Sequence, residues 1–337
     1  MKTFLKFLFY RGFCPFLLFL GLDKLWRTLS KNRRLIIMYH GVSRDNSFAI
    51  NGRHLPAAQF EKQLRYFKRN FNIVPLTDLC DAQLKGILPE KHTIALTFDD
   101  GYLNNISNAL PLLKKYQIPA TIFISSVSLE TRDYIQPTDY LDLINYSIAE
   151  TVAINGKIFR KDRYHLVDAN EKKSNVYQYI NSLDLSSWAK TFSDLQLRYP
   201  YKEVTRHVKD ETYSLITSSA LTALFRSDLI TIGSHGHWHV NLSVLSDTEV
   251  KDQLGTSKGI FSRHCRKPVE ILAFPYGYFN EMVLSVSRNL GYRYLIAGGS
   301  VEPEYRADVF PRIGILNLAG YAYNILSVNR GFGRFGF

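Results

Sequence analysis

Cysteine is scarce in this 337-residue chain: the three residues, Cys14, Cys80 and Cys265, are odd in number and far apart. They form neither a disulfide framework nor a C-x-x-C zinc site, so we expect a reducing, cytoplasmic compartment. Repeats and low-complexity tracts are also absent. With 46% apolar and 21% charged residues, the composition excludes disordered, collagen-like and polytopic membrane proteins.

A long apolar run is missing too. Near the N-terminus the uncharged stretch from Gly12 to Leu22 has 11 residues, whereas a spanning helix needs about 20. No small-x-small cleavage site follows it. The sequence therefore predicts neither a membrane span nor a conventional signal peptide at this end.

Acidic residues are nearly absent from residues 1–34, which hold eight basic residues and one acid and thus carry +7 of the net charge of +12. An apolar, cation-rich helical segment over 1–33 fits contact with the inner face of a membrane. The alternatives are an N-terminal helix packed on the domain and a signal or anchor segment. No nucleic-acid recognition motif accompanies the charge, so we expect no nucleic-acid partner.

Short apolar runs alternate with helical patterns from residue 34 onward. Strands are expected at 35–39, 93–98, 120–125, 229–233, 270–274, 294–297 and 312–316, and helices at 57–70, 103–116, 216–226, 247–263 and 281–290. This alternation predicts an α/β fold with a parallel sheet, in a barrel or an open arrangement. The stretch 125–228 breaks the rhythm and is interpreted as an insertion capping one end, with a hairpin turn at Asn155-Gly156. The domain is expected to span 34–320, followed by a tail over 321–337.

Two adjacent carboxylates, Asp99 and Asp100, close an apolar strand in the motif Thr-Phe-Asp-Asp-Gly and are followed by Gly101. Catalytic groups sit at strand ends in parallel α/β folds, and a bend at Gly101 can bring both acids into one site. The alternative is a helix N-cap for the helix that begins near Leu103.

Three histidines lie within five residues in Gly-Ser-His235-Gly-His237-Trp-His239, after another strand. Neutral imidazoles at positions 235 and 239, joined by a carboxylate from a second strand end, make a zinc site with an open position. We therefore expect a divalent metal there, with His237 outside the ligand set.

Two more strand ends carry candidate groups. Phe274-Pro275-Tyr276-Gly277 makes a tight turn that can aim the Tyr276 N–H at an oxyanion, or is an ordinary turn. Tyr39-His40-Gly41 places His40 as a candidate general acid, or as a core histidine. The other histidines, His54 among them, are interpreted as loop or surface residues.

In this order the motifs resemble the NodB-type polysaccharide deacetylases, carbohydrate esterase family 4. The resemblance rests on Thr97 to Gly101, on His235 to His239, and on Phe274-Pro275-Tyr276, and it extends to the flanking segments MYHGV, ALPLLKKYQIPATIFI and FPRIGI. It implies a distorted (β/α)7-type barrel, one divalent metal, and hydrolysis of N-acetyl groups on sugars.

By position, the resemblance implies that Asp99 is the general base and that Asp100, His235 and His239 bind the metal. Ala273 stands where the family has an arginine that orients the base, so Asp99 is expected to need another partner. No histidine follows His264 to supply the family's usual acid. In some members the acid comes from a Tyr-His motif on the first strand, which indicates His40, with His237 or a water as alternatives.

The sequence thus predicts a metal-dependent N-deacetylase of carbohydrates, with zinc as the expected metal and cobalt, nickel or manganese as alternatives. The substrate is expected to be an N-acetylated polysaccharide or a lipid-linked intermediate of surface-glycan synthesis. Two other functions are open, an inactive sugar-binding module and a metal-dependent hydrolase of a non-sugar amide or ester.

Overall fold

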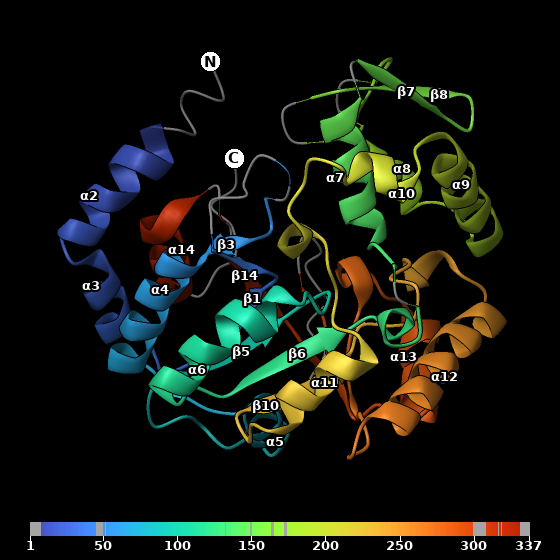
Figure 1. Cartoon of the computed structure of the whole chain (residues 1–337). Coiled ribbons are helices and arrows are strands. Elements are labelled where there is room, and N and C mark those ends of the chain that lie inside the picture. The colour runs from blue at the N-terminus through green and yellow to red at the C-terminus, as the bar shows by residue number, and fades with distance from the viewer. Residues whose placement is uncertain are drawn as a thin grey trace.

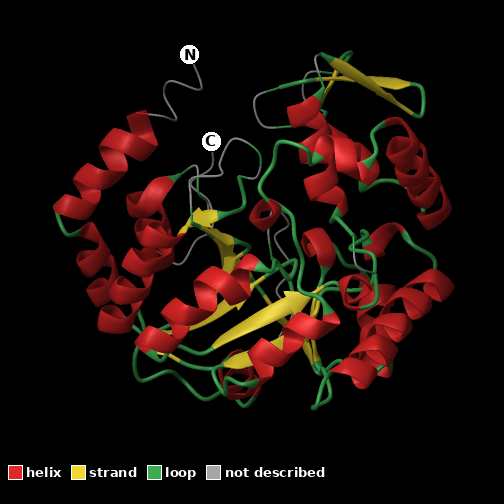
Figure 2. Ribbon diagram, in the orientation of Figure 1, coloured by secondary structure: helices red, strands yellow, loops and turns green. Residues whose placement is uncertain are grey.

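The computed structural model describes residues 8–44, 50, 52–131, 133–148, 150–162, 165–171, 174–298, 308–315, 317 and 319–330 (Figure 1). Its centre is a nine-stranded sheet with helices around it (Figure 2). The strands run in the order β13 (Val309–Phe310), β12 (Tyr294–Ile296), β11 (Ile271–Ala273), β10 (Ile230–Ser234), β6 (Ala120–Ile124), β5 (Thr93–Phe98), β1 (Arg34–Tyr39) and β14 (Arg312–Gly314), and β4 (Asn72–Ile73) also pairs with β5.

Every pairing in this sheet is parallel. The central strands β5 and β6 are buried along their whole length, which is typical of a parallel sheet covered on both faces. The seven strands expected from the sequence are all present. The α/β prediction is confirmed.

The ladder of strands does not close by hydrogen bonds into a complete barrel. Its two end strands, β13 and β14, follow each other in the chain and are separated only by Pro311. Proline cannot donate a backbone hydrogen bond, and the chain on either side of it pairs with β12 and with β1, respectively. The chain therefore changes pairing partner at Pro311, and β14 lies beside β1.

Helices connect and cover the strands. The longer ones are α4 (Ala57–Asn70), α5 (Leu76–Leu84), α6 (Leu110–Tyr116), α11 (Ser218–Phe225), α12 (Asp247–His264), α13 (Glu281–Asn289) and α14 (Gly320–Arg330). Short turns of helix are η3 (Asn105–Ala109), η6 (Leu242–Val244) and η7 (Pro275–Gly277), and the strands β2 (Val42–Ser43) and β3 (Leu55–Pro56) form a small separate pair. The start of α12 is fixed by a capping box between Ser246 and Glu249.

Residues 125–228 fold as a group of helices with a small antiparallel sheet. The elements are η4 (Ser126–Leu129), α7 (Pro137–Ser147), β7 (Thr151–Ile154), β8 (Lys157–Arg160), β9 (Val167–Asp168), α8 (Val176–Ile180), α9 (Leu185–Arg198), α10 (Tyr201–Val204), η5 (Asp210–Thr212) and α11. The hairpin turns at Asn155 and Gly156, both with positive φ, as their residue types predict.

The two ends of the chain pack together. η1 (Phe9–Phe13), α2 (Cys14–Phe19) and α3 (Leu22–Leu29) lie outside α14 and α4 at one edge of the molecule (Figure 1). The expected tail from residue 321 is wrong for 321–330, which belong to the buried helix α14; 331–337 lie outside the described residues. Among the residues described, no helix is long and apolar enough to cross a membrane.

Candidate metal-dependent active site

Both carboxylates of the Asp-Asp pair lie in one buried site at the end of β5. Tyr39 of β1 pairs with Phe98, and the Tyr39 carbonyl accepts a hydrogen bond from the Asp99 amide at 2.9 Å. Asp100 and Gly101 then adopt positive φ, 68° and 69°, which turns the chain sharply. A Cβ at position 101 would come within 3.2 Å of the Ile124 backbone, so the turn needs glycine.

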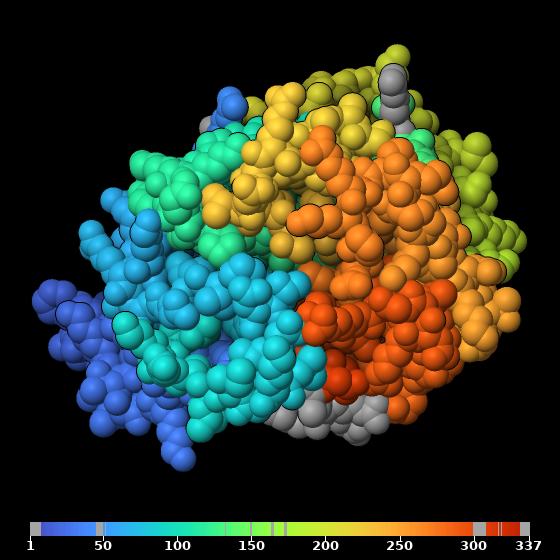
Figure 3. All heavy atoms as spheres, turned by 90° about the horizontal axis from the view of Figure 1, so that it is seen from below, coloured from blue at the N-terminus to red at the C-terminus, as the bar shows by residue number. Residues whose placement is uncertain are grey.

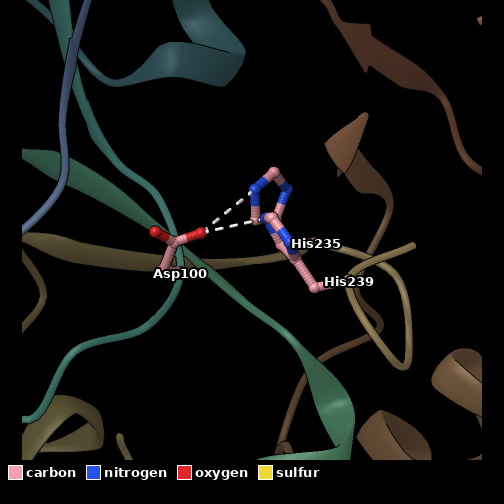
Figure 4. Close-up of side chains that lie close together, drawn as sticks. All are labelled: Asp100, His235 and His239. Atoms are coloured by element: carbon pink, nitrogen blue, oxygen red, sulfur yellow. Dashed lines mark ion pairs between the residues drawn. The ribbon is translucent and has the colours of Figure 1, made fainter. Parts of the chain in front are cut away.

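Asp100, His235 and His239 converge from two strand ends (Figure 4). His239 Nε2 lies 3.1 Å and His235 Nε2 lies 3.6 Å from Asp100 Oδ1. One ligand atom from each residue lies within 4.8 Å of the others, and all three residues are buried. One carboxylate and two imidazoles are a common donor set for a catalytic divalent metal.

The tautomer of His235 suits a metal ligand. Its Nδ1 lies 2.7 Å from the Ala273 carbonyl oxygen, and because a carbonyl only accepts, Nδ1 carries the proton. The Nε2 lone pair therefore faces Asp100. Burial lowers the pKa of His235 to about 4, so the ring is neutral at neutral pH. His239 adds a buried Nδ1 that has no hydrogen-bond partner among the described residues.

Asp99 is held by Arg312, at the start of β14. Arg312 Nη1 donates to Asp99 Oδ1 at 2.6 Å and Nη2 donates to Oδ2 at 2.8 Å, with 1% and 4% of the two side chains exposed. Burial alone would raise the pKa of Asp99, but the guanidinium outweighs it and the pKa is lowered. Asp99 is therefore an ionised carboxylate in a fixed orientation.

The sequence predicts that Asp99 needs a new partner, because Ala273 stands where the family has an arginine. Arg312 is that partner. It belongs to the FPRIGI segment, but nothing in that segment indicates a contact with Asp99. The contact depends on β14 pairing with β1, where Arg312 lies opposite Ile36, and on β1 pairing with β5. Its guanidinium lies 5.4 Å from the Phe123 ring centroid.

His40 follows β1 and lies next to the Asp99 strand end. Burial lowers its pKa, while the charges of Asp100 and Asp99 act against that shift. His54 lies in the loop before β3, but its expected place at the surface is wrong. Its side chain is fully buried, its ring centroid lies 4.4 Å from that of Tyr102, and a Cβ on Gly41 would lie 2.4 Å from the ring.

Tyr276 lies against the candidate ligands, whereas His237 does not. The Tyr276 backbone is left-handed, with φ 58° and ψ 0°, and its ring centroid lies 4.6 Å from that of His239. His237 Nδ1 instead lies 2.9 Å from Ser126 Oγ on η4. The group of residues that could hold a metal accordingly contains His235 and His239, with Asp100, and does not contain His237.

Residues 87–295 match the family profile described as polysaccharide deacetylase. The chain belongs to the polysaccharide deacetylase family. This confirms the resemblance seen in the motifs, and with it an enzyme family of carbohydrate deacetylases. A match to the protein YxkH of Bacillus subtilis, named as a polysaccharide deacetylase, has 24% identity over 160 residues and spans 45% of this chain and 56% of YxkH.

A longer match links this deacetylase to the poly-beta-1,6-N-acetyl-D-glucosamine N-deacetylase of Staphylococcus aureus (strain N315), with 22% identity over 299 residues, 84% of this chain and 79% of the relative. Among solved structures, the Streptococcus pyogenes deacetylase PplD has a TM-score of 0.56 at 16% identity and covers 88% of this chain and 98% of its own. The structure of IcaB from Ammonifex degensii has a TM-score of 0.54 at 14% sequence identity, and the match covers 87% of this chain and 97% of IcaB. At these identities the structures support the fold alone.

The deacetylase also has a charged cluster beside the metal site that sequence reasoning missed. Arg53 pairs with Asp139 and, at 2.9 Å, with Asp142, both on α7. Tyr102 donates to Asp139 at 2.9 Å, and Tyr177 of α8 donates to Asp142. Burial raises the pKa of Asp139 to about 7, with Arg53 opposing the shift and Asp100 adding to it. The cluster joins the 125–228 segment to Tyr102, directly after the turn at Asp100 and Gly101.

Proposed function

We propose that this deacetylase hydrolyses the N-acetyl groups of sugars in a glycan, with a metal held by Asp100, His235 and His239 and with Asp99 as general base. Its family supports deacetylation of N-acetylated sugars. The observation that carries the mechanism is the buried, bidentate Arg312–Asp99 pair beside the three convergent ligand atoms. It supplies an ionised base at a place where a divalent cation fits.

A bound divalent cation would polarise the acetyl carbonyl and lower the pKa of the attacking water. Asp99 accepts that water's proton as the water oxygen bonds to the carbonyl carbon. The Tyr276 amide donates to the resulting oxyanion. His40 protonates the nitrogen as the C–N bond breaks, which yields acetate and a free amine. Arg312 keeps Asp99 oriented throughout and keeps it ionised until it accepts this proton.

Zinc is the metal we propose, because one carboxylate and two imidazoles suit it. Cobalt, nickel and manganese are the alternatives. The absent family arginine at position 273 favoured an inactive sugar-binding module, but Arg312 supplies a cation to the base from another strand. A hydrolase of a non-sugar amide or ester is the alternative that substrate assays must separate.

We further propose a polymeric or lipid-linked N-acetylated glycan as substrate, handled in the cytoplasm at the inner face of the membrane. Two observations support it: the polymeric substrate in the name of the Staphylococcus aureus relative and the +7 charge of residues 1–34. The test is acetate release from polymeric, nucleotide-linked and lipid-linked N-acetyl sugars, with and without chelator. Chelator-sensitive release from a polymeric or lipid-linked sugar is expected. No release by metal-loaded protein would contradict the proposal.

A further inference from the structure

The N-terminal helices use one face to pack on the domain. Cys14 and the partly buried Leu17, Leu22 and Trp26 contact a small core on α14 that includes Leu326. A helix that only packs against its domain has a polar outer face. The outer face of these helices is therefore informative.

That outer face is apolar. Of the 15 large hydrophobic side chains that are exposed among the described residues, seven lie within 8–29. Phe19 and Leu29 are 85% and 75% exposed. Exposed apolar side chains gathered on one short segment indicate an interaction site. The seven are Leu8, Phe13, Phe16, Phe19, Leu20, Leu25 and Leu29.

Exposed cations accompany these apolar side chains on two parts of the chain. Arg11, Lys24 and Lys31 are exposed on the N-terminal segment itself, and Lys62, Arg65 and Arg69 are exposed on α4. The α4 cations lie beside α14, since the Lys62 ammonium is 4.1 Å from the Tyr321 ring centroid. In Figure 3 the N-terminal atoms form the edge of the molecule next to the light-blue atoms around residues 60–70.

The N-terminal segment has almost no acidic side chains that could neutralise its cations. Asp23 is the one acid in residues 1–34. It is 4% exposed and accepts a hydrogen bond from the Tyr66 hydroxyl at 2.5 Å. The segment therefore presents cations and apolar groups together, without a competing surface carboxylate.

A hollow of about 460 Å³ lies between α2 and α14 on this side of the molecule. Its lining includes Arg11 and Phe19 from the N-terminal segment, Lys62 from α4 and Tyr321 from α14. Cations and aromatic rings thus share one concavity. Anionic headgroups with attached acyl chains match this combination of charge and apolar surface.

We propose that the seven exposed apolar side chains and the six exposed cations, here named the basic apolar face, form a docking surface for an anionic membrane. The apolar side chains enter the boundary between headgroups and acyl chains, and the cations meet lipid phosphates. The surface is composite, because α4 contributes half of its cations from outside residues 1–33. It does not depend on the catalytic chemistry.

The test is co-sedimentation of the full-length protein with phosphatidylcholine vesicles that contain or lack phosphatidylglycerol. Wild type is expected to pellet with the anionic vesicles only. F19S/L29S should lose roughly tenfold or more in binding, the scale of two partly buried apolar side chains. K62Q/R65Q/R69Q should lose roughly fivefold for each cation removed.

Two matched control variants test whether the loss of vesicle binding is specific to the basic apolar face, because they change similar side chains elsewhere on the surface. L88S/L197S removes side chains that are 85% and 79% exposed elsewhere, and K190Q/K202Q/R206Q removes three exposed cations from the 125–228 segment. Both controls should bind as wild type does. All variants should keep wild-type acetate release from a soluble substrate, so failure here is distinct from failure of the catalytic proposal.

Three results would overturn the membrane assignment. The first is wild type that stays in solution with anionic vesicles, and the second is equal binding by wild type and both face variants. The third is a wild-type dimer in analytical ultracentrifugation that F19S/L29S converts to monomer without any change in vesicle binding. That last outcome would assign the face to a second copy of the chain.

Discussion

Replacing Arg312 tests how the base is kept ionised. Arg312 donates to both oxygens of Asp99 at 2.6 and 2.8 Å in a buried environment. Two charges about 4 Å apart at an effective dielectric constant of about 20 interact by about 4 kcal/mol. That energy corresponds to about 3 pKa units. In Arg312→Gln the pKa of Asp99 should therefore rise.

The assay is kcat/KM for acetate release as a function of pH, with metal-loaded protein. A protonated base is inactive, so the acidic limb of the Arg312→Gln profile should move up by about 3 pH units. The loss in kcat/KM should therefore be largest at the acidic end of the profile and much smaller near pH 8.5. Arg312→Lys keeps the positive charge but loses the bidentate contact. The acidic limb of its pH profile should therefore lie between those of wild type and Arg312→Gln.

The matched control is Arg288→Gln, which removes an arginine paired with Asp308 at the surface, where the side chains are 41% and 44% exposed. An exposed pair of this kind is worth little, so its pH profile should match wild type. An acidic limb that stays in place in Arg312→Gln, at wild-type metal content, would refute the role given to Arg312. Equal, pH-independent losses in all three variants would do the same.

Three further predictions concern individual histidines. His235→Ala should lose the bound metal and His237→Ala should keep it, because His235 faces Asp100 whereas His237 contacts Ser126; metal analysis after gel filtration checks this, and retention by His235→Ala would remove it from the ligand set. His40→Ala should slow amide substrates more than activated esters, whose leaving groups need no proton; equal slowing would exclude the acid role. Burial lowers the pKa of His54 to about 3, so between about pH 6.5 and pH 3 the unfolded chain binds a proton that the folded chain does not. Stability should therefore fall as the pH drops through this window, by up to about 5 kcal/mol. His54→Gln should flatten that fall in urea unfolding, whereas exposed His207→Asn should not; an unchanged slope in His54→Gln would contradict the assignment.

The candidate metal ligands could be predicted because each lies in a short motif at the end of an apolar strand. Parallel strands bring such ends to one edge of a sheet, and His235 and His239 lie close together in the chain. The same reasoning works for Asp99 and Asp100, where a glycine follows the strand. For these residues local pattern and three-dimensional position coincide.

Arg312 and Asp139 could not be found in this way, because their roles arise from long-range packing. Arg312 reaches Asp99 only through the pairing of β14 with β1 and of β1 with β5. Asp139 approaches the site from α7 through Arg53 and Tyr102. No spacing in the sequence encodes these contacts.

Helix α14 was missed for a related reason. It is buried on nearly all sides, including polar residues such as Asn324 and Asn329, so its sequence lacks an amphipathic period. Asn329 instead donates to the Tyr66 hydroxyl at 2.9 Å.

His54 was assigned to the surface because a lone histidine in a loop gives no sign that a glycine, Gly41, will make room for its ring.

Acetate release by Asp99→Asn protein is the most direct test of the catalytic account. The substitution should keep the metal, because Asp100, His235 and His239 are intact, and should lower kcat by at least about 100-fold, the scale of a lost general base. Asp247→Asn, at a half-exposed carboxylate on α12, is the control and should keep wild-type activity. Metal-loaded Asp99→Asn protein that releases acetate at the wild-type rate would contradict the mechanism.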